Sequence, residues 1–492
     1  MWSAECEMRS KSPSLLFFNS APRTPCSAFS PTPLLILALI GLLFALSGCQ
    51  GENKTSPPRL PAGVTNLSKT AALSIAPDIA ASGSGIYVVW QEHVDGQNMD
   101  VFLSRSGDGG ATFDAPINIS ESSIFSGNPK IAVSGNFVYI VWEESASTDT
   151  AENNDFDIFY RRGQDENGTF TWYPPLNEPG LRLSDPNPNC RNNSDPSGGA
   201  PCPSQTPAVV ASGSNVFIAW SESTIYQFRV NNTISPPAKE FQFINSEILM
   251  VRSTDGGVVF DPTPLILSGP KDESTPSPSL NPALAAAAGR VYIAWEDIPL
   301  PQPLPHQSKI LFRKLVDPLN LTVSPPLSVQ AAVLSGLIKQ SSRPSLAAEG
   351  SRVYLAWEGA LPEGGCPAVE GNTPLTTHEI LLIQSEDEGA QFSDPNDCAE
   401  SNLSATDGNS NSARIAVSEP TVYLSWMDNT PGLAGILFRK SEDSGGTFSA
   451  PSKIVEEEGS TANPSTAAVN GILFAAWEDA TLGNLEIVFS QR

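Results

Sequence analysis

The residues of this sequence that could do chemistry are mainly acids at one repeated position. A carboxylate stands two residues after a recurring tryptophan in six of seven copies, and Gly359 takes that place in the remaining copy. These acids are Glu92, Glu144, Glu222, Asp297, Asp428 and Asp479. In a ring they could attract Ca²⁺ or a basic partner, because hard cations prefer clustered oxygen ligands. Each acid could instead accept hydrogen bonds within its own copy, and the sequence leaves both interpretations open.

Other catalytic groups are scarce. The chain has three histidines, His93, His306 and His378, and their spacing supports no Ser-His-Asp constellation. Arg343 and Arg414 lie near the starts of expected strands and are candidates for a ligand-binding face. We expect no bound metal or cofactor, and Ca²⁺ is the one cation that the acids would suit.

The elements that must position these groups form a repeat, of which Pro77–Ser120 is the clearest copy. It holds short apolar segments rich in Ile, Val, Tyr, Phe and Trp, separated by Gly-, Ser- and Asn-containing breaks, which favours strands over helices. Four short antiparallel strands make one blade of a β-propeller. The second strand of each copy ends at Trp90, Trp142, Trp220, Trp295, Trp357, Trp426 and Trp477. The sequence therefore predicts an all-β propeller of seven four-stranded blades, with six as the fallback.

The two ends of the repeat predict how the ring closes. The last copy stops at Glu486–Arg492, a third strand, so its fourth strand is missing. Val64–Ser68 resembles the fourth-strand ending Ile117–Ser120. We expect this N-terminal strand to complete the last blade, because closure removes the unpaired sheet edges. Residues 63–492 would then form one propeller domain.

A tight turn follows the third strand in several copies. It reads S-x-D-x-G-x-T-F at Ser106–Phe113 and again at Ser441–Phe448, and it resembles the Asp box of the sialidase/BNR-repeat propellers. Asp165–Phe170 is a degraded copy, and the repeat around Arg313–Pro318 lacks the motif. The resemblance implies that these turns are structural and lie far from any active site. The residues that carry it are Ser106, Asp108, Gly110, Phe113, Asp255, Gly257, Phe260, Asp387, Gly389, Phe392, Ser441, Asp443, Gly445 and Phe448.

The same resemblance bears on activity. Sialidases of this family bind the substrate carboxylate with three arginines and carry an F/Y-R-I-P motif early in the chain, which this sequence lacks near its first copy. The matching strand entrances read Ala76, Asn128, Thr206, Asn281, Arg343, Ser412 and Asn463, of which Arg343 alone is cationic. The third-strand arginines, expected beside the turns, are Arg105, Arg162, Arg252, Arg313 and Arg439. We expect a noncatalytic propeller that binds a protein, peptide or glycan, with a divergent sialidase-like exo-glycoside hydrolase as the alternative.

The ligand face is expected opposite the Asp-box turns, where the loops after the second and fourth strands lie. The long insertions fall there: Glu143–Asp155, Asp185–Thr206, Ser221–Asn245, Glu296–Ser308 and Glu358–His378. They contain Arg191, Tyr226, Phe228, Arg229, Phe241 and Phe243. Loops on a rigid scaffold often carry binding residues, but these loops could equally pack on one another.

The N-terminal region indicates export. The apolar run Leu34–Leu46 fits a signal-peptide core, and Leu46-Ser-Gly-Cys49 resembles a bacterial lipobox. We expect 1–48 to be removed, Cys49 to be acylated, and 49–62 to form a tether. The protein would then be anchored to the cell envelope, at the outer membrane or cell surface. Four cysteines remain, and we expect the disulfides Cys190–Cys202 and Cys366–Cys398 in an oxidising compartment.

Charge limits the partners. The sequence has 28 basic and 53 acidic residues, a formal net charge of −25. Nucleic acid is disfavoured as a partner because it needs a basic face. We expect a monomer that contacts a membrane through its lipid and binds an unknown protein or glycan.

Overall fold

The computed structural model describes residues 59–95, 98–145, 156–184, 191–192, 203–231, 238–269, 277–299, 307–327, 331–362, 375–430, 435–455 and 461–492. All of them belong to the compact unit Pro58–Arg492. The predicted signal peptide, Cys49, most of the tether, and Cys190, Cys202 and Cys366 lie outside these residues. Lipidation and the disulfide pairings therefore remain predictions. No helix in the described ranges has the length and hydropathy to cross a bilayer.

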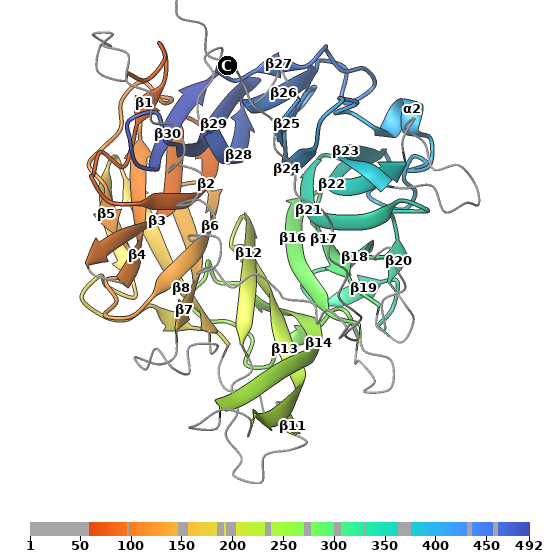
Figure 1. Cartoon of the computed structure of the whole chain (residues 1–492). Coiled ribbons are helices and arrows are strands. Elements are labelled where there is room, and N and C mark those ends of the chain that lie inside the picture. Colours follow the sequence, from red (N-terminus) through yellow and green to blue (C-terminus); the bar gives the residue numbers. More distant parts are fainter. Residues whose placement is uncertain are drawn as a thin grey trace, which may run out of the picture. The chain divides into compact units, whose positions relative to one another are not determined.

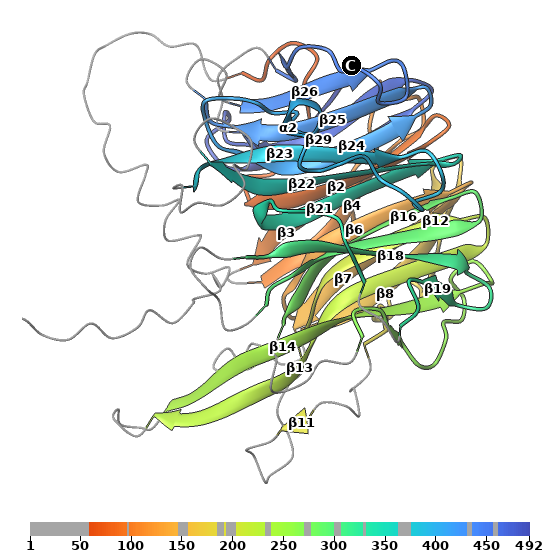
Figure 2. The same cartoon turned by 90° about the vertical axis from the view of Figure 1, so that its right-hand side faces the viewer.

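Seven blades surround one axis, with the first strand of each blade innermost (Figures 1 and 2). Blade 1 contains β2 (Ser74–Ser82), β3 (Gly85–Asp95), β4 (Asn98–Ser106) and β5 (Ile117–Asn118). Blade 2 contains β6 (Ser126–Ser134), β7 (Phe137–Ser145), β8 (Phe156–Glu166) and β10 (Leu181–Arg182), with β9 (Thr169–Tyr173) also paired to β8. Blade 3 contains β12 (Ser204–Ser212), β13 (Asn215–Asn231), β14 (Ala238–Ser253) and β15 (Leu265–Ile266), with β11 (Arg191–Asn192) parallel to β13.

The remaining blades follow the same order. Blade 4 contains β16 (Ser279–Ala287), β17 (Arg290–Asp297), β18 (Lys309–Asp317) and β20 (Ala332–Val333), with β19 (Thr322–Ser324) also on β18. Blade 5 contains β21 (Lys339–Glu349), β22 (Arg352–Pro362) and β23 (Leu375–Ser385), and a single bridge, Leu381 to Asn402, takes the fourth place after the short helix α2 (Cys398–Ser401). Blade 6 contains β24 (Ser410–Ser418), β25 (Thr421–Asp428), β26 (Gly435–Ser441) and β27 (Ser452–Lys453). The predicted seven-bladed all-β fold is confirmed.

Blade 7 confirms the predicted closure. It contains β28 (Thr461–Val469), β29 (Ile472–Asp479), β30 (Glu486–Gln491) and, as its outermost strand, β1 (Thr65–Asn66). β1 pairs antiparallel with β30, with Thr65 opposite Phe489. Leu67 is 1% exposed within a core cluster that blades 7 and 1 share. Val64 packs against blades 6 and 7, and so does Leu60, which lies in the predicted tether.

The core is divided among the junctions between blades. Seven hydrophobic clusters are found in the described residues, and each joins two neighbouring blades. The repeated tryptophan of the later blade lies in every one of them, and all seven tryptophans are fully buried. Each blade therefore depends on its neighbours for burial of its apolar faces.

The predicted turns are also contacts between blades. We call Ser106–Phe113, Ser253–Phe260, Ser385–Phe392 and Ser441–Phe448 the Ser-Asp turns, and the rim that carries them the turn rim. In the first of them, the Gly110 N–H donates to Ser106 Oγ over 2.8 Å and the Thr112 N–H to Asp108 Oδ1 over 2.9 Å. The Thr112 hydroxyl, followed by its backbone N–H, lowers the pKa of Asp108 to about 2, so this carboxylate is ionised at neutral pH. The aromatic at the end of the turn packs on the preceding blade, with ring centroids of Phe113 and Phe489 4.7 Å apart.

Long basic side chains strengthen the same rim. Arg162 Nη1 donates to Gly256 O of the next blade over 2.7 Å, and Arg252 Nη1 donates to Pro318 O over 2.8 Å. Arg105 pairs with Asp165 in the same way. These arginines lie beside the turns, as the sequence predicted.

Two of the five predicted arginines, Arg439 and Arg313, do not belong with them. Arg439 lies opposite Leu424, and the matching position opposite Tyr423 is held by Lys440. Arg313 also lies one residue out of register with Arg105, Arg162 and Arg252, so its side chain points to the other face of its blade. It is buried and donates to Pro326 O over 2.8 Å, and Arg161 donates to Pro174 O over 3.0 Å in the same manner. Blades 2 and 4 lack a complete Ser-Asp turn. In its place, the segment after the third strand is stabilised by a buried arginine, Arg161 or Arg313, and by the extra strand β9 or β19.

Two neighbouring glycines in the first turn provide a matched test of the blade contact. Both have positive φ, +72° for Gly109 and +90° for Gly110, but a Cβ at Gly110 would lie 2.7 Å from Phe489, whereas a Cβ at Gly109 meets nothing within 4 Å. Gly110→Ala should therefore destabilise the protein by about 1–3 kcal/mol more than Gly109→Ala, because the added methyl is overpacked. Equal unfolding free energies of the two variants in urea would contradict a close contact at this turn.

Ring closure can be tested by two deletions in lipid-free protein. Removing residues 59–68 takes away β1 and the buried Leu67. Loss of a buried leucine side chain alone costs about 2–5 kcal/mol, so a clearly lower melting temperature or aggregation is expected. Removing residues 51–58 is the control and should leave the melting temperature unchanged. Equal melting temperatures for both deletions would mean that β1 contributes nothing to the ring.

Candidate functional site

The candidate site lies at the rim opposite the Ser-Asp turns, where the first strand of each blade begins; we call it the entrance rim. Near its start, every first strand contains a residue with φ between 47° and 57° and a break in the pairing ladder. A bulge of this kind frees a backbone N–H, which needs another acceptor. These residues are the predicted strand entrances, Ala76, Asn128, Thr206, Asn281, Arg343, Ser412 and Asn463.

At five of the seven strand entrances, the acceptor comes from the preceding blade, from the residue directly after its tryptophan. Glu478 accepts the Ala76 N–H over 2.7 Å, Glu143 the Thr206 N–H over 2.6 Å, and Glu358 the Ser412 N–H over 2.6 Å. Gln91 and Glu296 accept the N–H of Asn128 and Arg343 in the same way. Sequence reasoning missed this position, although an acid or amide follows the tryptophan in these five copies.

The predicted acids, two residues after each tryptophan, serve their own blades. Trp90 Nε1 donates to Glu92 over 2.8 Å, and the Ser74 hydroxyl donates to the same carboxylate over 3.1 Å. The pattern recurs with Glu144, Glu222 and Asp428, and Asp479 accepts from Trp477. Asp297 accepts from Ser279 over 2.9 Å. These contacts match the interpretation in which each acid accepts hydrogen bonds inside its copy.

The length of the acid sets the quality of the tryptophan contact. The three glutamates lie 2.8–2.9 Å from the indole nitrogen, whereas Asp428 and Asp479 lie at 3.1 and 3.4 Å. At the exceptional Gly359, Ile338 fills the space that a side chain would need, and Trp357 Nε1 has no partner in the described residues. Trp295 Nε1 likewise has no partner among the described residues, although Asp297 stands two residues after it, so an aspartate at this position does not ensure the contact.

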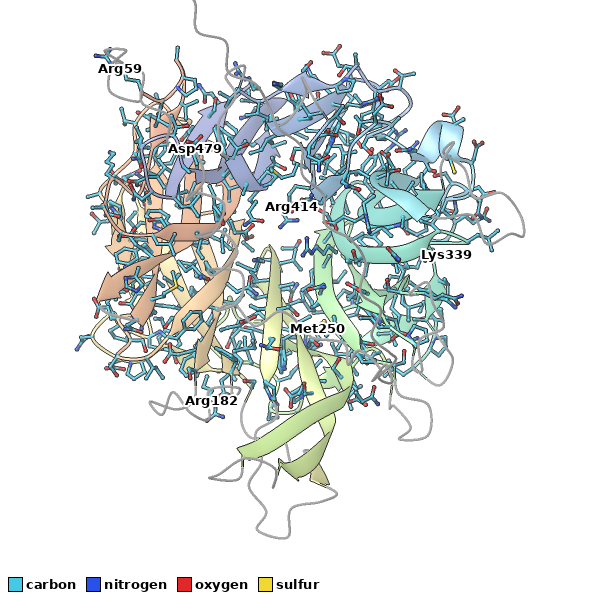
Figure 3. The ribbon with its side chains drawn as sticks, in the orientation of Figure 1. Arg59, Arg182, Met250, Lys339, Arg414 and Asp479 are labelled. Carbon is cyan, nitrogen blue, oxygen red and sulfur yellow. The ribbon has the colours of Figure 1, made fainter. Side chains whose placement is uncertain are left out.

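Three cations lie near the axis. Arg343 has a side chain that is 59% exposed, and its Nη1 is 3.5 Å from Glu358 Oε1. Arg414 is directed toward the centre of the ring (Figure 3) and donates to Ala413 O over 2.9 Å. Lys130 stands at the position in blade 2 that Arg414 holds in blade 6, two residues after the strand entrance, and the sequence reasoning did not single it out. The structure thus brings both predicted arginines to one region and adds a lysine.

In two of the entrance-rim acids, one carboxylate oxygen accepts both of the side chain's hydrogen bonds from the described residues. Glu143 Oε1 takes both the Thr206 N–H and the Asn128 amide, and Glu478 Oε1 takes both the Ala76 N–H and the Asn463 amide. Burial raises the pKa of Glu143, Glu296 and Glu478. Raised carboxyl pKa values can serve proton transfer, but the backbone bonds of these acids give each a structural task. No group of three or more potential metal ligands occurs among the described residues.

The long insertions are partly strands. The expected loop Ser221–Asn245 belongs to β13 and β14, which pair out to Asn231 and Ala238 and extend beyond the blade as a two-stranded ribbon (Figure 2). Its backbone register sets Tyr226 opposite Phe243 and Phe228 opposite Phe241. The expected loop Glu358–His378 likewise begins within β22 and ends within β23. The prediction of loops was wrong at these places, because the central strands of the blade continue past its edge.

Comparison with solved structures shows the fold. An ulvan lyase of polysaccharide lyase family PL25 is 10% identical, with a TM-score of 0.53 over 88% of this chain and 98% of that one. A Dyadobacter fermentans protein of unknown function is 12% identical, with a TM-score of 0.45 over 87% and 99% of the two chains. A Trypanosoma rangeli sialidase is 10% identical, with a TM-score of 0.46 over 88% of this chain. The match spans 60% of that sialidase chain.

These likenesses concern architecture. At such identity, the ulvan lyase match shows a shared β-propeller fold and nothing about chemistry. The seven blades and this match confirm the β-propeller fold that the predicted resemblance implied. No protein-family model matches the sequence, and no curated protein does.

The raised pKa values predict a pH-dependent stability. A carboxyl whose pKa is higher in the folded than in the unfolded state stabilises the fold below its unfolded pKa, about 4.3 for Glu, and this contribution is lost as the pH rises through the folded pKa. Glu143→Gln, Glu296→Gln and Glu478→Gln together keep an acceptor oxygen but remove the ionisation. The free energy of unfolding of the combined variant should therefore exceed that of the wild type most at pH 7–8, and the difference should disappear toward pH 4.5. A pH-independent difference in unfolding free energy would contradict this assignment.

Proposed function

We propose that this protein is a noncatalytic binding propeller, anchored to the cell envelope through Cys49, that takes a protein, peptide or glycan at its entrance rim. The proposal rests on the structural role of the entrance-rim acids, which accept hydrogen bonds from the next blade. Glu143, Glu296, Glu358 and Glu478 each hold a backbone N–H of the next blade. An acid that closes a junction in this way maintains the ring, and its displacement during a reaction would free a buried donor.

The cations favour binding at the same rim. Arg343 is the one cationic strand entrance, and within the described ranges its exposed guanidinium has one long contact, to Glu358. An exposed arginine can offer two parallel N–H groups to a carboxylate or to neighbouring hydroxyls of a ligand. On the turn rim, by contrast, Arg162, Arg252 and Lys314 donate to carbonyl groups of the next blade. Arg105 and Lys440 on the same rim pair with carboxylates. A ligand therefore finds free donors on the entrance rim.

A divergent exo-glycoside hydrolase is the second candidate. It is favoured by the raised pKa of Glu296, which lies near Arg343, since a general acid must hold its proton near neutral pH. Two solved propellers of similar fold are described as a sialidase and a polysaccharide lyase. The alternative requires turnover, which separates it from simple binding.

Binding and turnover can be measured on the same lipid-free protein, residues 50–492. We expect retention on a glycan and peptide array but no hydrolysis of a fluorogenic sialoside. Arg343→Met should raise the Kd for the ligand found on the array about 10-fold or more, because a charged hydrogen bond is worth about 1.5–3 kcal/mol. Arg352→Met is the matched control, since Arg352 donates to Ser444 O on the turn rim.

Two results would count against the proposal. Sialoside turnover that is lost in Glu296→Gln but retained in Arg352→Met would establish the hydrolase instead. Array binding that is equal in wild type and Arg343→Met would remove the entrance rim as the ligand site.

A further inference from the structure

We infer that Lys130 and Arg414 together bind an oxyanion (a carboxylate, sulfate or phosphate group) at the axis of the ring. The two residues occupy equivalent positions on β6 and β24, the first strands of blades 2 and 6. Side chains at this position reach neighbouring blades near the axis: the blade 1 member, Asp78, accepts the Ile131 N–H of blade 2 over 2.9 Å and the Ser465 hydroxyl of blade 7 over 2.8 Å. Arg414 itself is directed toward the centre of the ring (Figure 3).

Both cations keep donors that the protein does not use. Lys130 Nζ donates to Asn128 Oδ1 over 2.9 Å and to Pro129 O over 3.1 Å, and the Arg414 guanidinium donates only to Ala413 O among the described residues. Neither forms an ion pair with a carboxylate in the described part of the chain. A guanidinium has five N–H groups and an ammonium three, so most of those on Arg414 remain available. Half-buried cations with open donors fit an oxyanion.

The surrounding charges leave this site without a counter-ion in contact. Lys130 is near Asp78, Arg414 and Glu143, and Arg414 is near Asp78, Glu358 and Arg343. Burial lowers the pKa of both cations, and the nearby arginine lowers the pKa of Lys130 further. The carboxylates of Asp78, Glu143 and Glu358 are already held by backbone N–H groups of the neighbouring blade. A bound anion would reduce the repulsion between the cations without breaking a junction. It would also be repelled by these carboxylates, so its binding depends on direct hydrogen bonds from Lys130 and Arg414.

The site specifies the chemistry of the ligand. It rests on the proposed function in that an acidic group of a glycan or peptide would enter from the entrance rim and reach Lys130 and Arg414 beyond Arg343. The same chemistry would hold a free inorganic anion. Two kinds of probe distinguish these sources: sodium sulfate, and sodium glucuronate compared with glucose.

The experiment follows the melting temperature of lipid-free protein while sodium sulfate or sodium glucuronate replaces NaCl at constant ionic strength, and glucose is added at a fixed NaCl concentration. A saturable rise is expected, because a ligand that binds only the folded state stabilises it. Sulfate also strengthens folding non-specifically, so saturation and loss in variants decide the outcome. The apparent Kd should rise about 10-fold or more in Lys130→Met and in Arg414→Met, from loss of a charged hydrogen bond. It should be unchanged in Lys440→Met, since Lys440 pairs with Glu442 beside a Ser-Asp turn.

The outcomes separate the sources and the two proposals. Saturation by sulfate supports a site for small anions, and saturation by glucuronate but not by sulfate or glucose supports an acidic ligand. The absence of saturation with every probe, or saturation that persists in both Lys130→Met and Arg414→Met, overturns the inference. If array binding still depends on Arg343 in that case, the entrance rim remains the ligand site and only the axial oxyanion site is lost. Melting of each variant in NaCl alone shows that it is folded.

Discussion

Each blade of this ring has two apolar faces that only its two neighbours can cover. The hydrophobic clusters are accordingly shared by adjacent blades, and every repeated tryptophan is buried in a junction with the preceding blade. A blade removed from the ring would expose large aromatic side chains on both sides, and burial of such surface is the main favourable term in folding. The ring therefore behaves as one unit rather than as a chain of independent repeats.

The two rims secure the junctions by different means. At the turn rim, glycines allow the Ser-Asp turns to approach the preceding blade, and basic side chains donate to carbonyl groups across the junction. At the entrance rim, glutamate oxygens accept the N–H groups that bulges release. At the turn rim, Arg162 and Arg252 are bound to carbonyl groups of the next blade, whereas the entrance rim keeps the exposed Arg343 and, near the axis, Lys130 and Arg414. This asymmetry supports the proposal of a ligand site at the entrance rim.

Much of the fold could be predicted from the sequence because its signals are local and repeated. Seven tryptophans at the ends of apolar segments gave the blades, and the resemblance of Val64–Ser68 to a fourth strand gave the closure. The glutamates directly after the tryptophans were missed because their partner is a backbone N–H of another blade, which no residue type reveals. Arg313 was grouped with Arg105 because a shift of one residue, which reverses the face of a strand, is hard to see between gapped repeats.

The pairing of β1 with β30 has a consequence for the order of events during synthesis. These strands are separated by almost the whole propeller, yet they lie side by side in blade 7. β1 can take its native place only after β30, which is made last, is available for pairing. Contacts of such long sequence separation form slowly, so the nascent chain carries open sheet edges throughout translation. Any cellular factor that shields those edges would act on the incomplete ring and would have no surface to hold once Phe489 faces Thr65.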